Sequence, residues 1–154
     1  MSLDLSDPSL ALSFLPSTYH VLRLPRTTPL PSEITSLLSK PATSSSFFSL
    51  TLTPTETSVI LPSAAFANLP ADVVSPHSPI PGTDEEGPWA LLKVAGPMQL
   101  HLTGILHAFV GPLKDAGVAI FASSTYDTDY VLVHAADQEK AELALRRAGW
   151  VFKP

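Results

Sequence analysis

The stretch VAIFASSTYDTDYVLVHA, from Val118 to Ala135, decides the fold of this chain. It begins with apolar, β-rich residues typical of a strand and ends with a second such run, Val131 to Val133. Every residue from Ser123 to Tyr130 carries a hydroxyl or a carboxylate, and none is glycine. A hairpin turn needs only about two to five residues, and Asn-Gly or Asp-Gly usually supplies it. The stretch therefore predicts a hairpin whose connection is either simply polar or a binding site.

The residues around this hairpin extend the pattern in both directions. Before it, the apolar segment 89–95 predicts a buried strand, and an apolar stripe predicts a helix over about 103–116, ended by Gly117. After it, acidic residues at the start and arginines at the end predict a helix over about 137–149, and 150–153 reads as a last strand. The order strand, helix, strand, strand, helix, strand is that of a ferredoxin-like βαββαβ unit.

The N-terminal half repeats the first part of this order. Strands are predicted at 19–24, 47–53 and 58–62, with a short helix over 31–40 between the first two. All prolines except Pro112 and Pro154 lie at or before Pro97, which excludes long uninterrupted helices from this half. The fold class is therefore α+β, with two ferredoxin-like units in tandem and the N-terminal one incomplete.

Composition places boundaries between these units. We predict an N-terminal βαββ unit over 14–62, a connector rich in proline, glycine and acidic residues over 63–87, and a complete unit over 88–154. The connector is expected to be extended because proline and glycine disfavour regular elements.

Charge and residue usage exclude several classes of function. The net charge of −5 and pI of about 5.4 argue against nucleic acid or an anionic membrane as the main partner. No window offers the roughly 20 apolar residues of a membrane span, and the first residues are a poor signal peptide. The chain has no cysteine, which excludes disulfides and thiolate sites and favours a cytoplasmic location.

Chemical motifs point away from catalysis. The five histidines show no metal-ligand spacing, and no nucleophile elbow, phosphate loop or dinucleotide fingerprint is present. We therefore expect no metal, no cofactor and no catalytic residue, and the chain is predicted not to be an enzyme.

Three segments carry a resemblance to a known family. The segments LLKVAGPMQLHLTGIL, GPLKDAGVAIFASSTYDTDYVLV and ALRRAGW resemble small two-ACT-domain proteins related to the CASTOR cytosolic arginine sensors. The resemblance covers roughly 89–152 and extends weakly to the N-terminal half. It implies that both ferredoxin-like units are ACT units, which are regulatory modules that bind small ligands, most often amino acids, between paired domains.

The resemblance also implies a ligand site made of two surfaces. One surface combines the turn before the first helix of the C-terminal unit with the hairpin, and its implied residues are Thr103, Gly104, Ile105, Leu106, Thr125, Tyr126, Thr128 and Asp129. The other surface, contributed by the partner domain, is the start of the next strand, Ala119 and Ile120. The arginine sensors carry both surfaces in one chain of about twice this length. The resemblance therefore implies a homodimer here, with two symmetric sites.

The chemistry of these residues is consistent with an amino-acid ligand. The carboxylate of Asp129 suits an α-amino group, and the free N–H groups at the helix start suit an α-carboxylate. Gly104 would allow the ligand to approach the backbone closely. Asp127 is interpreted as a polar turn residue. In the arginine sensors an acidic residue beside this turn would bind the guanidinium group, and the matching residue here looks like Leu102. A less basic or apolar amino acid is therefore as compatible with this site as arginine.

The sequence thus supports three hypotheses. The first is a non-catalytic amino-acid sensor that binds its ligand at the ACT–ACT interface of a homodimer. The second is an adaptor that holds a protein partner without any small ligand, which the low content of charged residues, 15 %, also fits. The third is a regulatory subunit of an enzyme of amino-acid metabolism.

Overall fold

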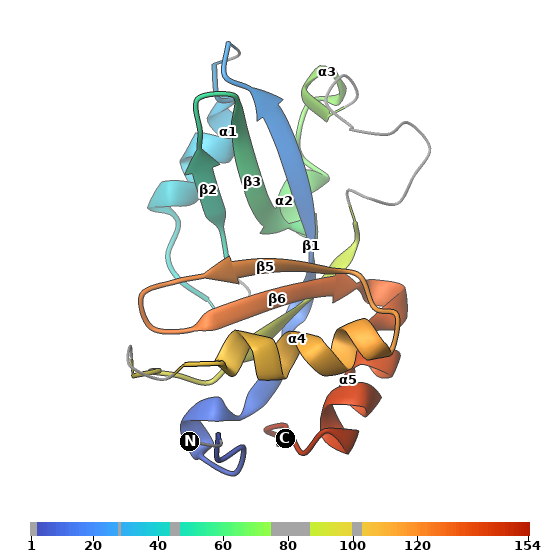
Figure 1. Cartoon of the computed structure of the whole chain (residues 1–154). Coiled ribbons are helices and arrows are strands. Elements are labelled where there is room, and N and C mark those ends of the chain that lie inside the picture. Colours follow the sequence, from blue (N-terminus) through green and yellow to red (C-terminus); the bar gives the residue numbers. More distant parts are fainter. Residues whose placement is uncertain (1–2, 28, 44–46, 75–86, 100–102) are drawn as a thin grey trace. The chain divides into compact units, whose positions relative to one another are not determined.

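The computed structural model describes residues 3–27, 29–43, 47–74, 87–99 and 103–154. The chain forms two compact units, each with its own packed interior. We call Met1–Leu15 together with Ala90–Pro154 the C-terminal unit, and Pro16–Trp89 the middle unit. Figure 1 labels the elements of both units. Residues from both ends of the chain therefore form the C-terminal unit, and the residues between them form the middle unit.

The middle unit follows the predicted strand, helix, strand, strand order. Its elements are the part of β1 (Leu12–Pro25) that follows Leu15, α1 (Ser32–Thr35), the 3-10 helix η2 (Ser36–Ser39), β2 (Ser49–Leu52), β3 (Glu56–Pro62), α2 (Ser63–Phe66) and α3 (Ala71–Val74). Strand β3 lies between β2 and β1 and pairs with both in antiparallel fashion. This order of strands is that of an incomplete ferredoxin-like unit, as predicted.

The α-helices described in the middle unit have four residues each, and a proline precedes each of them. Pro31, Pro62 and Pro70 each stand immediately before a helix, where the missing N–H group costs nothing. The buried cluster beneath these helices is accordingly small and consists of Leu22, Leu24, Ile34, Val59 and Leu61. Helices α2 and α3 occupy the first part of the segment predicted as a connector, and residues 75–86 of that segment lie outside the described residues.

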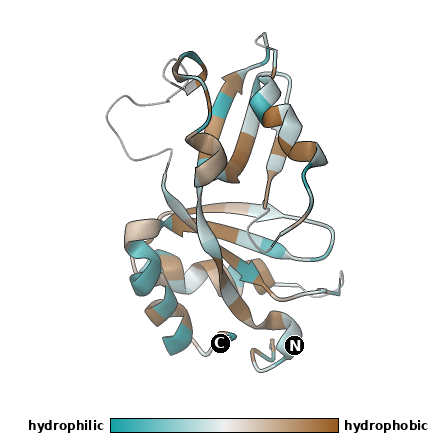
Figure 2. Ribbon diagram, turned by 180° about the vertical axis from the view of Figure 1, so that it is seen from behind, coloured by the Kyte–Doolittle hydropathy of each residue, from teal (hydrophilic) through white to brown (hydrophobic). Residues whose placement is uncertain are grey.

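The C-terminal unit has two longer helices. Its elements are the 3-10 helix η1 (Pro8–Leu10), the first residues of β1, β4 (Trp89–Val94) from Ala90 on, α4 (Ile105–Asp115), β5 (Ile120–Ser124), β6 (Asp129–His134), the 3-10 helix η5 (Ala135–Asp137) and α5 (Gln138–Arg147). The strand order is β1, β4, β6, β5, which leaves β5 at the edge, paired only with β6 among the described strands. Figure 2 shows apolar positions along the strands and hydrophilic positions on the outer turns of the helices.

Both long helices end in the same glycine-dependent motif. After α4, Gly117 has φ = 67°, its N–H donates to the carbonyl of Lys114, and the N–H of Val118 donates to that of Leu113. These two bonds form a Schellman motif, which satisfies carbonyls that the helix leaves open. Gly149, with φ = 96°, ends α5 in the same way. The predicted role of Gly117 as the terminating glycine is thereby confirmed.

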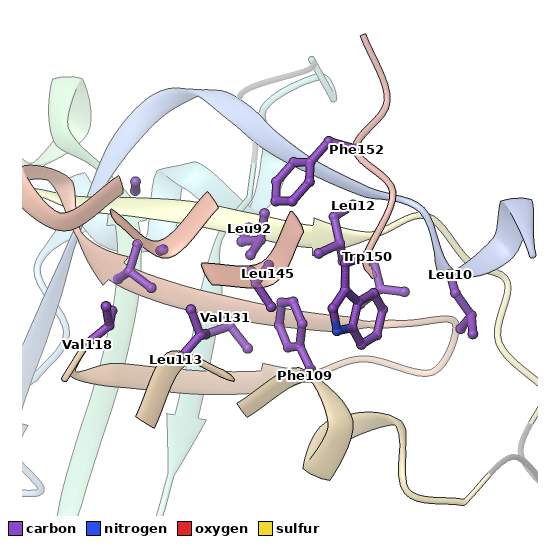
Figure 3. Close-up of a cluster of buried hydrophobic side chains, with 14 of the residues drawn as sticks. Leu10, Leu12, Leu92, Phe109, Leu113, Val118, Val131, Leu145, Trp150 and Phe152 are labelled. Carbon is purple, nitrogen blue, oxygen red and sulfur yellow. The ribbon is translucent and has the colours of Figure 1, made fainter. Parts of the chain in front are cut away.

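The core of the C-terminal unit is built from both helices and the strands. The rings of Phe109 and Trp150 meet edge to face with centroids 5.3 Å apart, and the Trp150 indole N–H donates to the carbonyl of Ala108 at 3.3 Å. Figure 3 shows Leu113 and Leu145 beside this aromatic pair. All four side chains are buried, so α4 and α5 are held on the sheet by one continuous apolar layer.

The first residues of the chain complete this sheet. The N–H of Leu12 donates to the carbonyl of Val151, and the N–H of Lys153 donates to the carbonyl of Leu12, both at 2.8 Å. On the other side, the N–H of Ala95 donates to the carbonyl of Ala11 at 2.8 Å. The predicted last strand over 150–153 is therefore reduced to one bridged residue, Phe152, beside Leu12. A local sequence pattern does not show this pairing because its partners lie at opposite ends of the chain.

Candidate functional site

A pocket of about 330 Å³ lies between the start of α4 and the hairpin that joins β5 to β6. We call it the hairpin pocket. Its lining residues are Met98, Gln99, Gly104, Ile105, Leu106, Ser124, Thr125, Tyr126, Asp127, Thr128 and Asp129. The two parts of the first predicted surface are therefore brought together by the fold. The volume lies in the range of about 300–1,000 Å³ that is typical of small-ligand sites.

The start of α4 offers unused backbone donors to this pocket. Gly104 is the residue that precedes the helix and has φ = 81°, a left-handed conformation that favours glycine. Among the described residues no side chain caps the helix, and its first turn contains no acidic residue. The first intrahelical bond is donated by Ala108 to the carbonyl of Gly104, so the N–H groups of 105–107 have no acceptor within the helix. These groups and the helix dipole favour an anionic ligand atom at this point.

The predicted helix over 103–116 thus begins two residues later than expected. Thr103 is exposed and does not cap α4, because Gly104 takes the position before the first helical residue. A β-carbon on Gly104 would meet no atom within 4 Å, so its glycine is required by the backbone conformation and not by crowding. The backbone at Gly104 is consequently open to an approaching ligand.

The hairpin holds its shape through its own threonines. The N–H of Thr125 donates to the carbonyl of Thr128 at 2.8 Å, and the Thr125 hydroxyl donates to the same carbonyl at 3.0 Å. In return, the N–H of Thr128 donates to the Thr125 hydroxyl at 3.3 Å. These bonds close a turn that needs no glycine, which accounts for part of the hydroxyl content of the stretch.

The Thr128 side chain fastens the hairpin to the rest of the sheet. It is 4 % exposed, and its hydroxyl donates to the carbonyl of Val94 at 2.7 Å. The N–H of Met98 donates to the carbonyl of Asp127 at 2.8 Å. At Gly96 a β-carbon would stand 3.1 Å from both the Asp127 carbonyl oxygen and Thr128 Cβ. The hydroxyl of Thr128 is thus engaged in positioning the hairpin, although the residue lines the pocket.

Asp129, at the first position of β6, presents one of the two carboxylates that line the pocket. The Ser124 hydroxyl donates to one of its oxygens at 2.6 Å, and the two residues face each other across the β5–β6 ladder. Asp129 is half-buried, whereas Asp127 is exposed and Tyr126 is 85 % exposed. The Ser124 contact fixes the orientation of the Asp129 carboxylate while its second oxygen remains an acceptor.

A second, larger pocket of about 660 Å³ lies along the outer side of α4 beside the edge strand. We call it the edge pocket. Its apolar members are Leu106, Val110, Ile120 and Ala122, and its polar members include His107, Lys114 and Asp115. Leu106 lines both pockets. The edge pocket therefore adjoins the hairpin pocket and contains Ile120 of the second predicted surface.

Comparison with known proteins places this geometry in a family context. Residues 85–147 match the family model of the ACT domain. This match spans α4 and the whole β5–β6 hairpin. The chain is also 31 % identical over 98 residues to the human protein CASTOR3P, across 59 % of this chain and 56 % of that protein. The chain thus spans little more than half of this curated relative.

Solved structures agree with the fold. The protein Atu0741 from Agrobacterium tumefaciens superposes with a TM-score of 0.70 at 28 % identity, over 93 % of this chain and 91 % of that one. The regulatory subunit of aspartate kinase from Thermus thermophilus has a TM-score of 0.56 at 12 % identity, over 90 % and 97 % respectively. The second likeness is one of fold alone. The predicted resemblance to tandem ACT proteins of the CASTOR type is confirmed.

Within the ACT segment, most of the implied site residues lie around one pocket. Seven of them line the hairpin pocket: Gly104, Ile105, Leu106, Thr125, Tyr126, Thr128 and Asp129. Thr103 lies next to it in the chain, and Ala119 is exposed and is named in the lining of neither pocket. Leu102, the residue compared with the guanidinium-reading position, lies outside the described residues.

Sequence reasoning missed four residues that also line the hairpin pocket. These are Met98, Gln99, Ser124 and Asp127. Ser124 and Asp127 belong to the polar stretch, which was a usable signal. Met98 and Gln99 follow β4, and the backbone bond from Met98 to Asp127 connects this segment to the hairpin.

Other kinds of site are not found in the part of the chain that the structure describes. No cluster of three or more histidine, aspartate or glutamate residues there could hold a metal ion. Within the same residues, no helix is both long and apolar enough to cross a bilayer.

Proposed function

We propose that this chain is a non-catalytic regulatory protein that binds a free amino acid in the hairpin pocket of a homodimer. In this proposal ACT-like units over 14–62 and 88–154 are joined by the segment 63–87. The observation that carries it is the meeting of the uncapped start of α4 with the Asp129 carboxylate around one pocket. The match of residues 85–147 to the family model of the ACT domain supports the regulatory role.

Each charged end of an amino acid has a partner in this pocket. The α-carboxylate accepts hydrogen bonds from the N–H groups at the start of α4, where the helix dipole adds a favourable field. The α-ammonium donates to the free oxygen of Asp129, which Ser124 holds in place. Leu106 and Met98 supply apolar surface for a side chain.

A second copy of the chain completes the site in this proposal. Strand β5 ends the sheet of the C-terminal unit, and the apolar residues of the edge pocket lie beside it. A strand edge with exposed apolar neighbours is a favourable surface for pairing with another chain. A two-fold related copy would place its own Ala119 and Ile120 near the hairpin pocket and create two equivalent sites.

The first test is a thermal-shift screen of the twenty amino acids, followed by calorimetry on any that stabilise the protein. A ligand at one hundred times its Kd should stabilise the folded state by about 2.7 kcal/mol, a rise of a few degrees. Asp129→Ala should weaken binding by at least about tenfold because it removes a charge-assisted bond. Glu139→Gln is the control: Glu139 is an exposed acidic residue on α5 that is not among the lining residues of either pocket, so its loss should change the affinity little.

The dimer is tested separately by sedimentation at several concentrations. Wild-type chain should sediment as a dimer, and Ala122→Glu should make it monomeric because it places a charge in the apolar edge pocket. Far-ultraviolet circular dichroism would show that the variant remains folded, since Ala122 is exposed. A monomeric wild-type chain that still binds an amino acid with full affinity would contradict the two-chain site.

An adaptor role is the second candidate, and a specific observation favours it. Leu106, Phe121 and Tyr126 are exposed by 42 %, 44 % and 85 % and lie on α4, β5 and the hairpin. Exposed apolar side chains suit a protein partner, including the catalytic subunit of an enzyme of amino-acid metabolism. If no amino acid raises the melting temperature, binding of a protein partner becomes the favoured function.

A further inference from the structure

The middle unit contains a pocket of about 430 Å³ that the proposed amino-acid site does not use. It opens where the end of η2, the start of β2 and helix α2 come together, and we call it the middle-unit pocket. Its apolar wall includes Leu37, Phe48 and Ala65. The volume lies within the range of about 300–1,000 Å³ that is typical of small-ligand sites.

The short helices of the middle unit explain why this pocket exists. Helices α1 and α2 have four residues each. Two prolines line the pocket: Pro62 immediately precedes α2, and Pro41 follows the 3-10 helix η2. In a complete ferredoxin-like unit, longer helices would cover this part of the apolar layer. Here Leu37 and Phe48 pack against the buried cluster but remain only partly buried, so the short helices leave apolar surface uncovered.

The charge of the lining selects the kind of ligand. Lys40 lies on the exposed rim, and no aspartate or glutamate is among the residues that line the pocket in the described part of the chain. None of the ion pairs between described residues involves Lys40. The neighbouring polar groups, Ser17 and Asn68, are uncharged. An anionic group beside Lys40 would form a charge-assisted contact.

We propose that the middle-unit pocket binds a small monocarboxylate with an apolar body. The carboxylate lies at the Lys40 ammonium, and the apolar body packs against Leu37, Phe48 and Ala65. This ligand class differs from that of the hairpin pocket, which presents Asp127 and Asp129 and no lysine or arginine in its lining. A free amino acid is a poor occupant of the middle-unit pocket, because its ammonium would be repelled by Lys40 and would find no carboxylate.

The test uses octanoate as the probe, titrated calorimetrically into the full-length chain. Octylamine and octanol, which share its apolar tail, are titrated in parallel. Octanoate should bind about three- to fivefold more tightly than octanol, and octylamine should bind most weakly. Equal binding of the three compounds would overturn the proposal, since it would show apolar adsorption without recognition of the carboxylate. Absence of octanoate binding up to millimolar concentration would overturn it as well.

Variants locate the bound probe. Lys40→Ala should weaken octanoate binding about three- to fivefold, whereas Lys40→Arg should largely retain it. Ala64→Phe, at an exposed position that lines the pocket, should block it. Ala67→Phe is the matched control, because Ala67 is exposed just after the same helix and is not among the lining residues. Full affinity in both Lys40→Ala and Ala64→Phe would refute the assignment.

The two proposals fail independently. Asp129→Ala should leave octanoate binding unchanged, and Lys40→Ala should leave amino-acid binding unchanged. A loss of octanoate binding in Asp129→Ala, in a variant that retains its circular dichroism spectrum, would place the probe in the hairpin pocket and overturn the middle-unit site.

Discussion

The two units of this chain use the same order of strands and helices, but their helices differ in length. In the C-terminal unit α4 and α5 have 11 and 10 residues, whereas α1 and α2 of the middle unit have four each. The long helices end at glycines in Schellman motifs, and the short ones follow prolines. Helix length therefore decides how much of the sheet is covered in two units whose elements follow a similar order.

This difference also separates the two candidate sites. In the C-terminal unit the interior is filled, and the hairpin pocket lies at the rim, where backbone donors and carboxylates are exposed to a ligand. In the middle unit the apolar layer itself is left partly open, and its pocket has apolar walls with one cation. A polar zwitterion suits the first pocket, and an amphipathic anion suits the second.

The largest expected effect comes from opening the filled core. Phe109→Ala should lower the free energy of unfolding by about 3–5 kcal/mol, because it removes a fully buried ring that contacts Trp150. The matched pair for the two cores is Leu113→Ala in this unit and Leu61→Ala in the smaller cluster, since both side chains are fully buried. Leu61→Ala should cost less within the range of about 2–5 kcal/mol, because its partly buried neighbours can relax into the gap. Urea unfolding followed by circular dichroism measures all three variants. A cost for Leu61→Ala equal to or above that for Leu113→Ala would break the contrast between the two cores.

The next effect concerns the contact that positions the hairpin. Thr128→Val should lower stability by about 1–3 kcal/mol, because it leaves the buried carbonyl of Val94 without its donor. It should also weaken amino-acid binding by displacing the turn. Thr125→Val, which alters an exposed hydroxyl of the same turn, is the control and should cost less. Equal costs for the two variants, again by urea unfolding, would show that the Val94 contact is unimportant.

Replacing the glycine that ends α4 should have a smaller effect on stability. Gly117→Ala should cost about 1–2 kcal/mol, because alanine is strained at φ = 67° although a β-carbon there has open space. Gly111→Ala, inside α4 and also unobstructed, should instead be neutral or stabilising. The melting temperature should therefore fall in Gly117→Ala and stay unchanged or rise in Gly111→Ala. A similar fall in both variants would contradict the role of Gly117.

The smallest effect is expected on the surface of the middle unit. Arg23 and Glu56 pair across β1 and β3 at 3.0 Å, but their side chains are 55 % and 37 % exposed. Glu56→Gln should change the free energy of unfolding by less than about 1 kcal/mol, since solvent screens such pairs. The measurement is the urea midpoint at low and high salt. A larger, salt-dependent loss would show that ion pairs compensate for the small core of this unit.

Local patterns predicted most of the elements, because strand alternation, the stripe of α4 and Gly117 are all signals within a short window. They also identified the hairpin as the place of the candidate site. Local patterns could not predict that the backbone of Leu12 bonds to residues 151 and 153, or that the Thr128 hydroxyl donates to the carbonyl of Val94. These contacts join segments far apart in the chain, and nothing in a single segment encodes them. The start of α4 was misplaced because the left-handed conformation of Gly104 was not anticipated.

The pairing of Leu12 with residues 151–153 has a consequence for biosynthesis. The backbone of residues 11–12 is bonded on one side near the end of β4 and on the other to residues far later in the chain. The middle unit, whose residues are contiguous, can close while translation continues. The C-terminal unit cannot complete its sheet until residues 151–153 have left the ribosome, because residue 12 has no partner on that side before then.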